Sequence, residues 1–153
     1  MLDYRAKHLQ GVEDKEGQQL IFAVIAAAGG PTITELNDMK LSDSAELRAQ
    51  WGDACENYGD IVPVHPEGWN IELRHAIGNG VTTVFMREPR GKDMKTPGRS
   101  KYQHNRNLLL GLLSAPDSDT PILPSDIDEM GMGDYLNIIH HINVVSGVDY
   151  QGF

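Results

Sequence analysis

The sequence predicts an α+β fold, mainly helical with a central antiparallel β-hairpin or small sheet. One observation is a pair of extended patterns joined by the turn sequence Gly-Asn-Gly at residues 78–80. The other is that segments with the length and composition of helices lie on both sides of this hairpin. With 153 residues, the chain is long enough to bury a core of its own.

The N-terminal part is predicted to be helical. Residues 16–28 are apolar almost all round and run into Gly-Gly-Pro, so we expect a helix that is buried in the fold or against a partner. Thr32 and Glu35 have the spacing of a capping box, which predicts a short helix directly afterwards. Asp43 is expected to be the N-cap of a third helix that ends near Gly59.

The middle of the chain is predicted to be extended. Residues 69–74 alternate apolar and polar side chains, as a half-buried strand does, and residues 81–87 form the returning strand. Pro89 ends this strand, because proline cannot donate to a ladder of hydrogen bonds. A hairpin alone is marginal in water, so it needs the helices, a further strand at 61–64, or another subunit.

Helical patterns return in the C-terminal part. A leucine-rich helix is expected at 102–115, and Asp134 is expected to be the N-cap of a final helix that Gly147 closes. The segments 36–47 and 127–138 are similar at an offset of 91 residues. They are either two copies of one helix–turn–helix unit or two unrelated helix pairs that share an aspartate cap.

The sequence is compatible with two domain organisations. A helical N-terminal segment, residues 1–60, precedes a unit of hairpin and C-terminal helices, residues 61–153, or both form one domain. The single cysteine, Cys55, excludes an internal disulfide framework and is interpreted as a packed helix residue. No apolar run approaches the roughly 20 residues needed to span a bilayer, and the N-terminus lacks a signal-peptide pattern. These features predict a cytoplasmic protein without a membrane partner.

The net charge of −9 makes nucleic acid an unlikely partner for the whole chain. The exception is a basic segment that follows the hairpin. It either meets the acidic ends of the chain, forms a solvated loop, or contacts an acidic partner. The basic segment comprises Arg87, Arg90, Lys92, Lys95, Arg99, Lys101 and Arg106.

No pattern for catalysis was found in the sequence. There is no dinucleotide-binding or phosphate-binding glycine motif, no histidine pair with the spacing of metal ligands on a helix, and no Gly-x-Ser-x-Gly elbow. We therefore predict a protein that is not an enzyme, with no catalytic, cofactor-binding or metal-binding residues and no cofactor.

The hairpin is followed by the segments "NLLLGLL" and "LPSDIDEMGMGDYLNIIHHI". Through these stretches, over about residues 67–146, the chain resembles phage tail assembly chaperones of the Mu-like group. Ala76 stands where the family usually has proline, and residues 16–59 have no counterpart. The matching hairpin residues are Leu73, Ala76, Ile77, Gly80, Val84, Met86, Arg87, Glu88, Pro89, Gly91, Asp93 and Met94.

The resemblance implies a late, non-enzymatic protein that binds the helical tape-measure protein, or another tail protein, in the host cytoplasm during virion morphogenesis. A homo-oligomer is a further partner class. The alternative is a structural subunit of the tail, baseplate or neck, incorporated in the virion. Methionines are flexible enough to line a tolerant surface, although core filling is their commoner use. The candidate partner-binding residues are Arg87, Arg90, Lys92, Lys95, Arg99, Lys101, Met130 and Met132.

Overall fold

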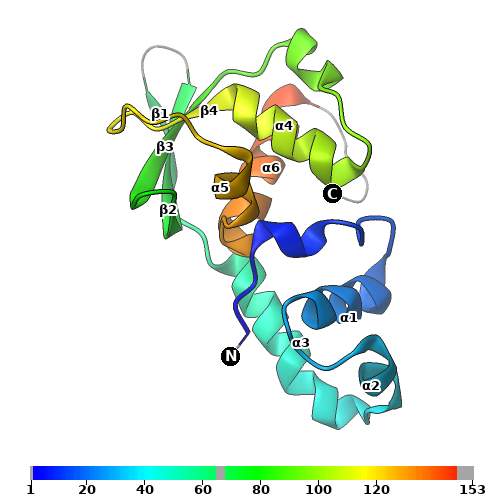
Figure 1. The fold of residues 1–153 in the computed structure, drawn as a ribbon. Coiled ribbons are helices and arrows are strands. Elements are labelled where there is room, and N and C mark those ends of the chain that lie inside the picture. Colours follow the sequence, from blue (N-terminus) through cyan, green and yellow to red (C-terminus); the bar gives the residue numbers. More distant parts are fainter. Residues whose placement is uncertain (1, 65–67, 148–153) are drawn as a thin grey trace.

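The computed structural model describes residues 2–64 and 68–147 and confirms the α+β fold. Helices occupy most of the molecule, and a small antiparallel sheet lies at one side (Figure 1). The elements in chain order are η1 Ala6–Leu9, α1 Gly17–Ala27, α2 Ile33–Asp38, α3 Leu41–Glu56, β1 Ile61–Val64, β2 Gly68–Ile77, β3 Val81–Arg87, η2 Gly91–Lys95, α4 Lys101–Leu112, β4 Leu113–Ser114, α5 Pro124–Asp128 and α6 Met132–Ser146.

The sheet contains four antiparallel strands in the order β1-β2-β3-β4. The predicted hairpin is β2 and β3, joined at Gly78 and Gly80, whose positive φ angles of 55° and 86° suit glycine. The helix predicted over 102–115 was too long. It ends at Leu112, because Leu113 and Ser114 pair as β4 with Met86 and Phe85 of β3.

The outer edge of the sheet is blunted by a proline. The backbone carbonyl of Asp60 accepts a hydrogen bond from the Glu72 amide at 2.9 Å, and the register pairs Ile61 with Ile71 and Pro63 with Trp69. In this alternation the backbone groups of Pro63 face away from β2. An incoming strand would therefore meet a position without an N–H donor, which disfavours extension of the sheet at β1.

The predicted capping box is confirmed, and the two predicted aspartate caps are wrong. Thr32 Oγ1 accepts from the Glu35 amide at 3.2 Å, and Glu35 Oε1 accepts from the Thr32 amide at 3.1 Å. By contrast, α3 begins at Leu41 and α6 begins at Met132. Asp43 and Asp134 are thus the third residues of their helices rather than their N-caps.

The carboxylate of Asp134 binds the backbone of the sheet. Its side chain accepts hydrogen bonds from the Arg74 amide at 3.0 Å and from the His75 amide at 3.1 Å. These amides lie in an irregular part of β2, where the register to β3 shifts between Glu72 and Ile77. Burial raises the pKa of Asp134, and the two amide donors oppose this shift.

Two apolar clusters form the core. One combines the sheet with α4, α5 and α6, and the other combines α1, α2 and α3 with Tyr4 and Met132. Leu9 and Leu136 pack against both clusters. The N-terminal segment connects them further, since the Ala6 amide donates to the Met130 carbonyl at 2.8 Å and the Met132 amide donates to the Tyr4 carbonyl at 3.0 Å.

The segments that are similar in sequence also share their backbone geometry. Their longer helices, α3 and α6, begin 91 residues apart. The residues before them, Lys40 and Gly131, have φ and ψ of −61° and 144° and of −57° and 142°. Before the shorter helices, the Leu123 amide donates to Asp126 at 2.8 Å, as the Thr32 amide does to Glu35. We call α2–α3 and α5–α6 the two helix-pair copies.

The two aspartates give a matched test of this structure. We expect Asp134→Ala to lower the free energy of unfolding by about 2–4 kcal/mol, because it leaves two partly buried backbone amides without an acceptor. Asp43 is exposed, so Asp43→Ala should change stability by less than about 0.5 kcal/mol. Urea denaturation of both variants measures the difference. Equal losses of about 1 kcal/mol would instead indicate two ordinary N-caps.

Candidate functional site

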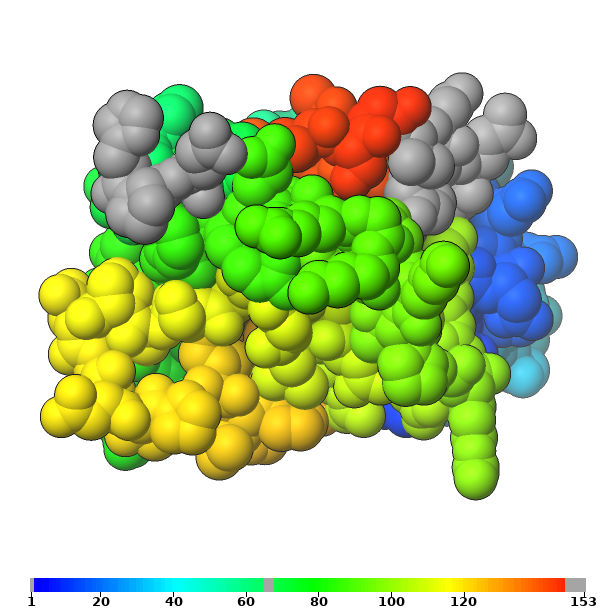
Figure 2. Space-filling model, turned by 90° about the horizontal axis from the view of Figure 1, so that it is seen from above, coloured from blue at the N-terminus to red at the C-terminus, as the bar shows by residue number. Residues whose placement is uncertain are grey.

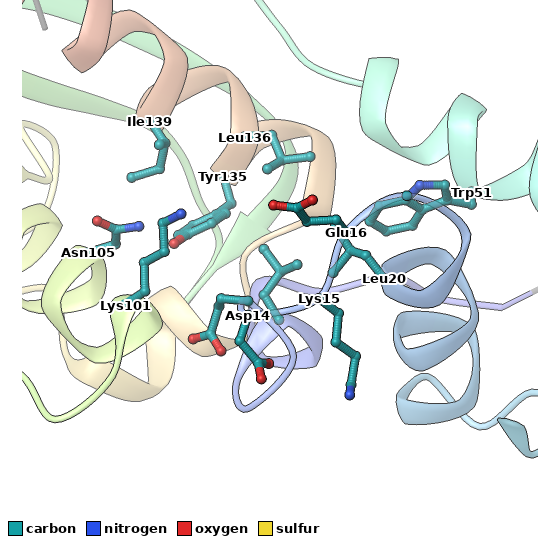
Figure 3. Close-up of a pocket in the computed structure, with 13 residues that line it drawn as sticks. Asp14, Lys15, Glu16, Leu20, Trp51, Lys101, Asn105, Tyr135, Leu136 and Ile139 are labelled. Carbon is teal, nitrogen blue, oxygen red and sulfur yellow. The ribbon is translucent and has the colours of Figure 1, made fainter. Parts of the chain in front are cut away.

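A groove with a volume of about 560 Å³ lies between the N-terminal helices and the helices α4 and α6. In Figure 3, Lys101, Asn105 and Tyr135 form one wall, and Leu20 and Trp51 form the opposite one. The groove is lined by Leu9, Glu13, Asp14, Lys15, Glu16, Gly17, Leu20, Trp51, Lys101, Asn105, Tyr135, Leu136 and Ile139.

The floor of the groove is apolar because it lies where the two core clusters meet. Leu9 and Leu136, which pack against both clusters, are part of it. Trp51 projects from α3, and its ring packs edge-on against Tyr4 with centroids 5.4 Å apart. The aromatic wall is thus held by the N-terminal segment, which itself is hydrogen-bonded to the chain before α6.

The rim and one wall are polar. Glu13 accepts a hydrogen bond from the Tyr102 amide at 2.7 Å and so satisfies a free donor in the first turn of α4. Asn105 hydrogen-bonds the hydroxyl of Tyr135, whose pKa is raised by burial. Among the described residues, the buried Asn105 Oδ1 has no partner. This oxygen is buried beneath the wall of the groove, so it is not exposed to a partner there.

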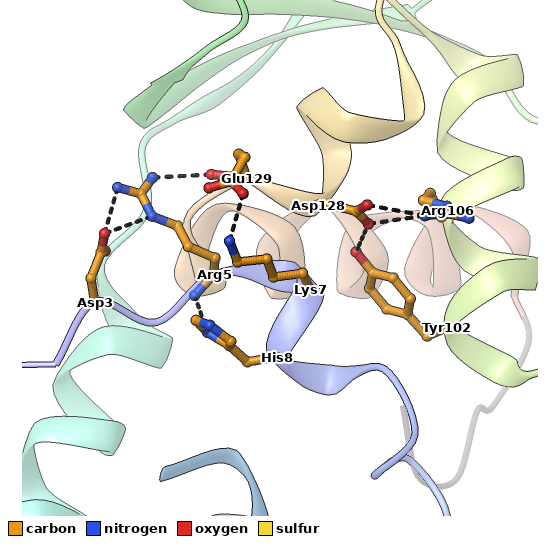
Figure 4. Close-up of polar contacts among 8 residues, drawn as sticks. All are labelled: Asp3, Arg5, Lys7, His8, Tyr102, Arg106, Asp128 and Glu129. Carbon is orange, nitrogen blue, oxygen red and sulfur yellow. Dashed lines mark hydrogen bonds and ion pairs between the residues drawn. The ribbon is translucent and has the colours of Figure 1, made fainter. Parts of the chain in front are cut away.

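Two polar clusters hold the segments beneath the groove together (Figure 4). Lys7 forms an ion pair of 2.6 Å with Glu129, which ties η1 to the end of α5. Asp128 accepts from the Tyr102 hydroxyl at 2.6 Å and pairs with Arg106 at 3.1 Å, which ties α4 to the same place. Both clusters fix elements that form the groove.

The lining of the groove combines apolar side chains with charged side chains of both signs. Apolar anchors surrounded by charges of both signs are typical of grooves that receive a helix. Within residues 2–64 and 68–147, no group of three or more His, Cys, Asp or Glu side chains could hold a metal ion. Burial raises the pKa of the Cys55 thiol to about 11, so this thiol is protonated at neutral pH and is a weak nucleophile.

The part of the basic segment before α4, residues 87–99, forms a ridge beside that helix, which we call the basic ridge (Figure 2). Its order comes from Asp93, which accepts from both terminal nitrogens of Arg87 at 2.9 and 2.6 Å and from the Arg90 amide at 2.7 Å. Four of the predicted partner-binding residues are exposed on this ridge, namely Arg90, Lys92, Lys95 and Arg99. Lys101 is the first residue of α4 and lines the groove.

Met130 and Met132 do not line a binding surface. Their exposed fractions are 0% and 1%, so the hypothesis that they present flexible side chains to a partner is wrong. The physical reason is the N-terminal segment, whose backbone covers the turn between α5 and α6 and places both methionines in the core. The groove residues come from segments that are far apart in the sequence, and no sequence pattern indicates that they lie together.

In comparisons with known proteins, no protein-family model, no curated protein and no solved structure matches this chain. None of the helices in the part of the chain that the structure describes has both the length and the apolar character to cross a membrane.

The bidentate pair of Arg87 and Asp93 predicts a specific pH dependence. The guanidinium lowers the pKa of Asp93 to about 2 from an ordinary value of 3.8. Because the folded value is the lower one, the pair adds stability above about pH 4 that is lost as the pH falls through about 2. Screening by water limits this contribution to about 1 kcal/mol.

A carboxyl-detected NMR titration of Asp93 measures this pKa. In Arg87→Gln it should return toward 3.8, whereas Arg90→Gln is the control, because the Arg90 contact uses its backbone amide. A wild-type value near 4 would show that the ridge is a solvated loop without this pair.

Proposed function

We propose that this protein is a non-enzymatic assembly chaperone that holds a helical segment of a partner during the assembly of a phage tail. The observation that supports this most strongly is the groove, with its apolar floor and its exposed charges. A groove of about 560 Å³ can receive a few anchor side chains of an amphipathic helix.

The tape-measure protein is proposed as the partner on the basis of the resemblance of residues 67–146 to tail assembly chaperones. Its long, apolar helices need cover until tube subunits surround them, and that need would place the complex in the host cytoplasm. The basic ridge lies beside α4, whose first residue lines the groove. Its exposed charges would raise the association rate with an acidic or mixed-charge partner more than they raise the affinity.

The alternative role, a structural subunit of the tail, baseplate or neck, has less support. Subunits that assemble through strand pairing need an open sheet edge, and Pro63 blunts the edge at β1. The opposite edge strand, β4, has only two residues. Mass spectrometry of purified virions separates the roles, since a chaperone is absent from the finished particle and a structural subunit is abundant in it.

Binding should depend on the groove and not on other exposed apolar residues. We expect Leu20→Ser to weaken binding of a labelled tape-measure fragment about tenfold, because truncating an interface anchor costs more than about 1 kcal/mol. Val144→Ser is the control, since Val144 is an exposed apolar residue that does not line the groove. Fluorescence anisotropy measures both affinities. Equal affinities for the two variants would contradict the groove as the binding site.

A further inference from the structure

We propose that the turn between α2 and α3 is a second docking site, which binds an extended segment of a partner protein that carries an aromatic residue and, three positions later, a lysine or arginine. This turn site consists of Asp38, Met39, Lys40, Leu41 and Asp43. It is independent of the groove, because none of these residues lines it.

The evidence is the second helix-pair copy, in which the equivalent turn is occupied. There the N-terminal segment runs across the turn between α5 and α6 and forms an antiparallel bridge between Arg5 and Gly131. The Met130 carbonyl accepts from the Ala6 amide, and the Met132 amide donates to the Tyr4 carbonyl. Equivalent groups of Met39 and Leu41 stand at the same positions of the first copy.

The N-terminal segment also contacts side chains of the second helix-pair copy. Tyr4 packs in one apolar cluster with Met132, and Lys7 forms an ion pair with Glu129 at 2.6 Å. At the offset of 91 residues, Leu41 corresponds to Met132 and Asp38 corresponds to Glu129. The first copy therefore has an apolar side chain, Leu41, and a carboxylate, Asp38, at the spacing that Met132 and Glu129 have in the second copy.

The first copy leaves these groups uncovered. The exposed fraction of Leu41 is 64%, whereas that of Met132 is 1%. Asp38, Lys40 and Asp43 are exposed too. As the first residue of α3, Leu41 has an amide that finds no acceptor inside its own helix. Figure 1 shows the start of α3 at the end of the molecule opposite the sheet.

The chemistry of the occupant follows from these contacts. An extended backbone supplies one carbonyl to the Leu41 amide and one amide to the Met39 carbonyl, as in a two-residue strand pairing. An aromatic side chain covers Leu41, and a cationic side chain pairs with Asp38. The chain's own segment Leu2–Leu9, with Tyr4 and Lys7, has this pattern and serves as the probe.

The test is an NMR titration of the full-length protein with the synthetic peptide LDYRAKHL, acetylated and amidated at its ends. We expect the peptide to shift the amide resonances of Lys40, Leu41 and Asp43. Leu41→Pro should weaken this binding about tenfold beyond Leu41→Ala, because proline removes the donor amide. Proline is well tolerated as the first residue of a helix, and the extended Lys40 before it is compatible with it, so α3 should persist.

A second variant tests the charge. Asp38→Asn should weaken binding about two- to fivefold at low salt, and this difference should vanish at high salt. The proposal is overturned if the shifts are confined to residues 130–134, which would show exchange with the chain's own N-terminal segment. It is equally overturned if Leu41→Pro and Leu41→Ala bind the peptide alike, since the pairing with the Leu41 amide would then be absent.

Discussion

The fold depends on how tightly other segments pack around the start of α6. A Cβ atom on Gly131 would lie 2.4 Å from the His75 ring, and one on Gly133 would lie 2.2 Å from the Asn57 carbonyl oxygen. Only glycine permits these approaches. One residue later, Asp134 binds the amides of the irregular part of β2. The sheet, the end of α3 and the N-terminal segment therefore all meet at one helix end, which we call the α6 junction.

The groove is a consequence of the α6 junction. Its two walls belong to different parts of the chain, with Trp51 on α3 and Tyr135 on α6. The wall with Trp51 is apolar and the wall with Tyr135 is polar, and the packing of α3 against α6 together with the docking of the N-terminal segment brings them into one concave surface. The proposed chaperone function thus rests on tertiary contacts rather than on a local motif.

The structural features that depend on residues close together in the sequence could be predicted from it. The buried helix α1, the capping box of Thr32 and the hairpin turn all follow from local patterns. The contacts of Asp134 and Leu113 with the sheet could not be predicted in the same way. An aspartate near a helix start looks like an N-cap whether it binds its own helix or a strand 60 residues away, and a leucine at a helix end gives no sign that it pairs with a strand. The groove was missed for the same reason.

The central claim is that the α6 junction makes the N-terminal helices and the sheet one cooperative unit. The two tryptophans report on these parts separately, since Trp51 lies on α3 and Trp69 lies on β2 against His141. The direct measurement is urea unfolding of Trp69→Phe and Trp51→Phe, with tryptophan fluorescence and helical circular dichroism recorded on each variant. We predict that both signals share one midpoint within each variant. A fluorescence transition clearly separated from the dichroism transition in either variant would contradict this claim.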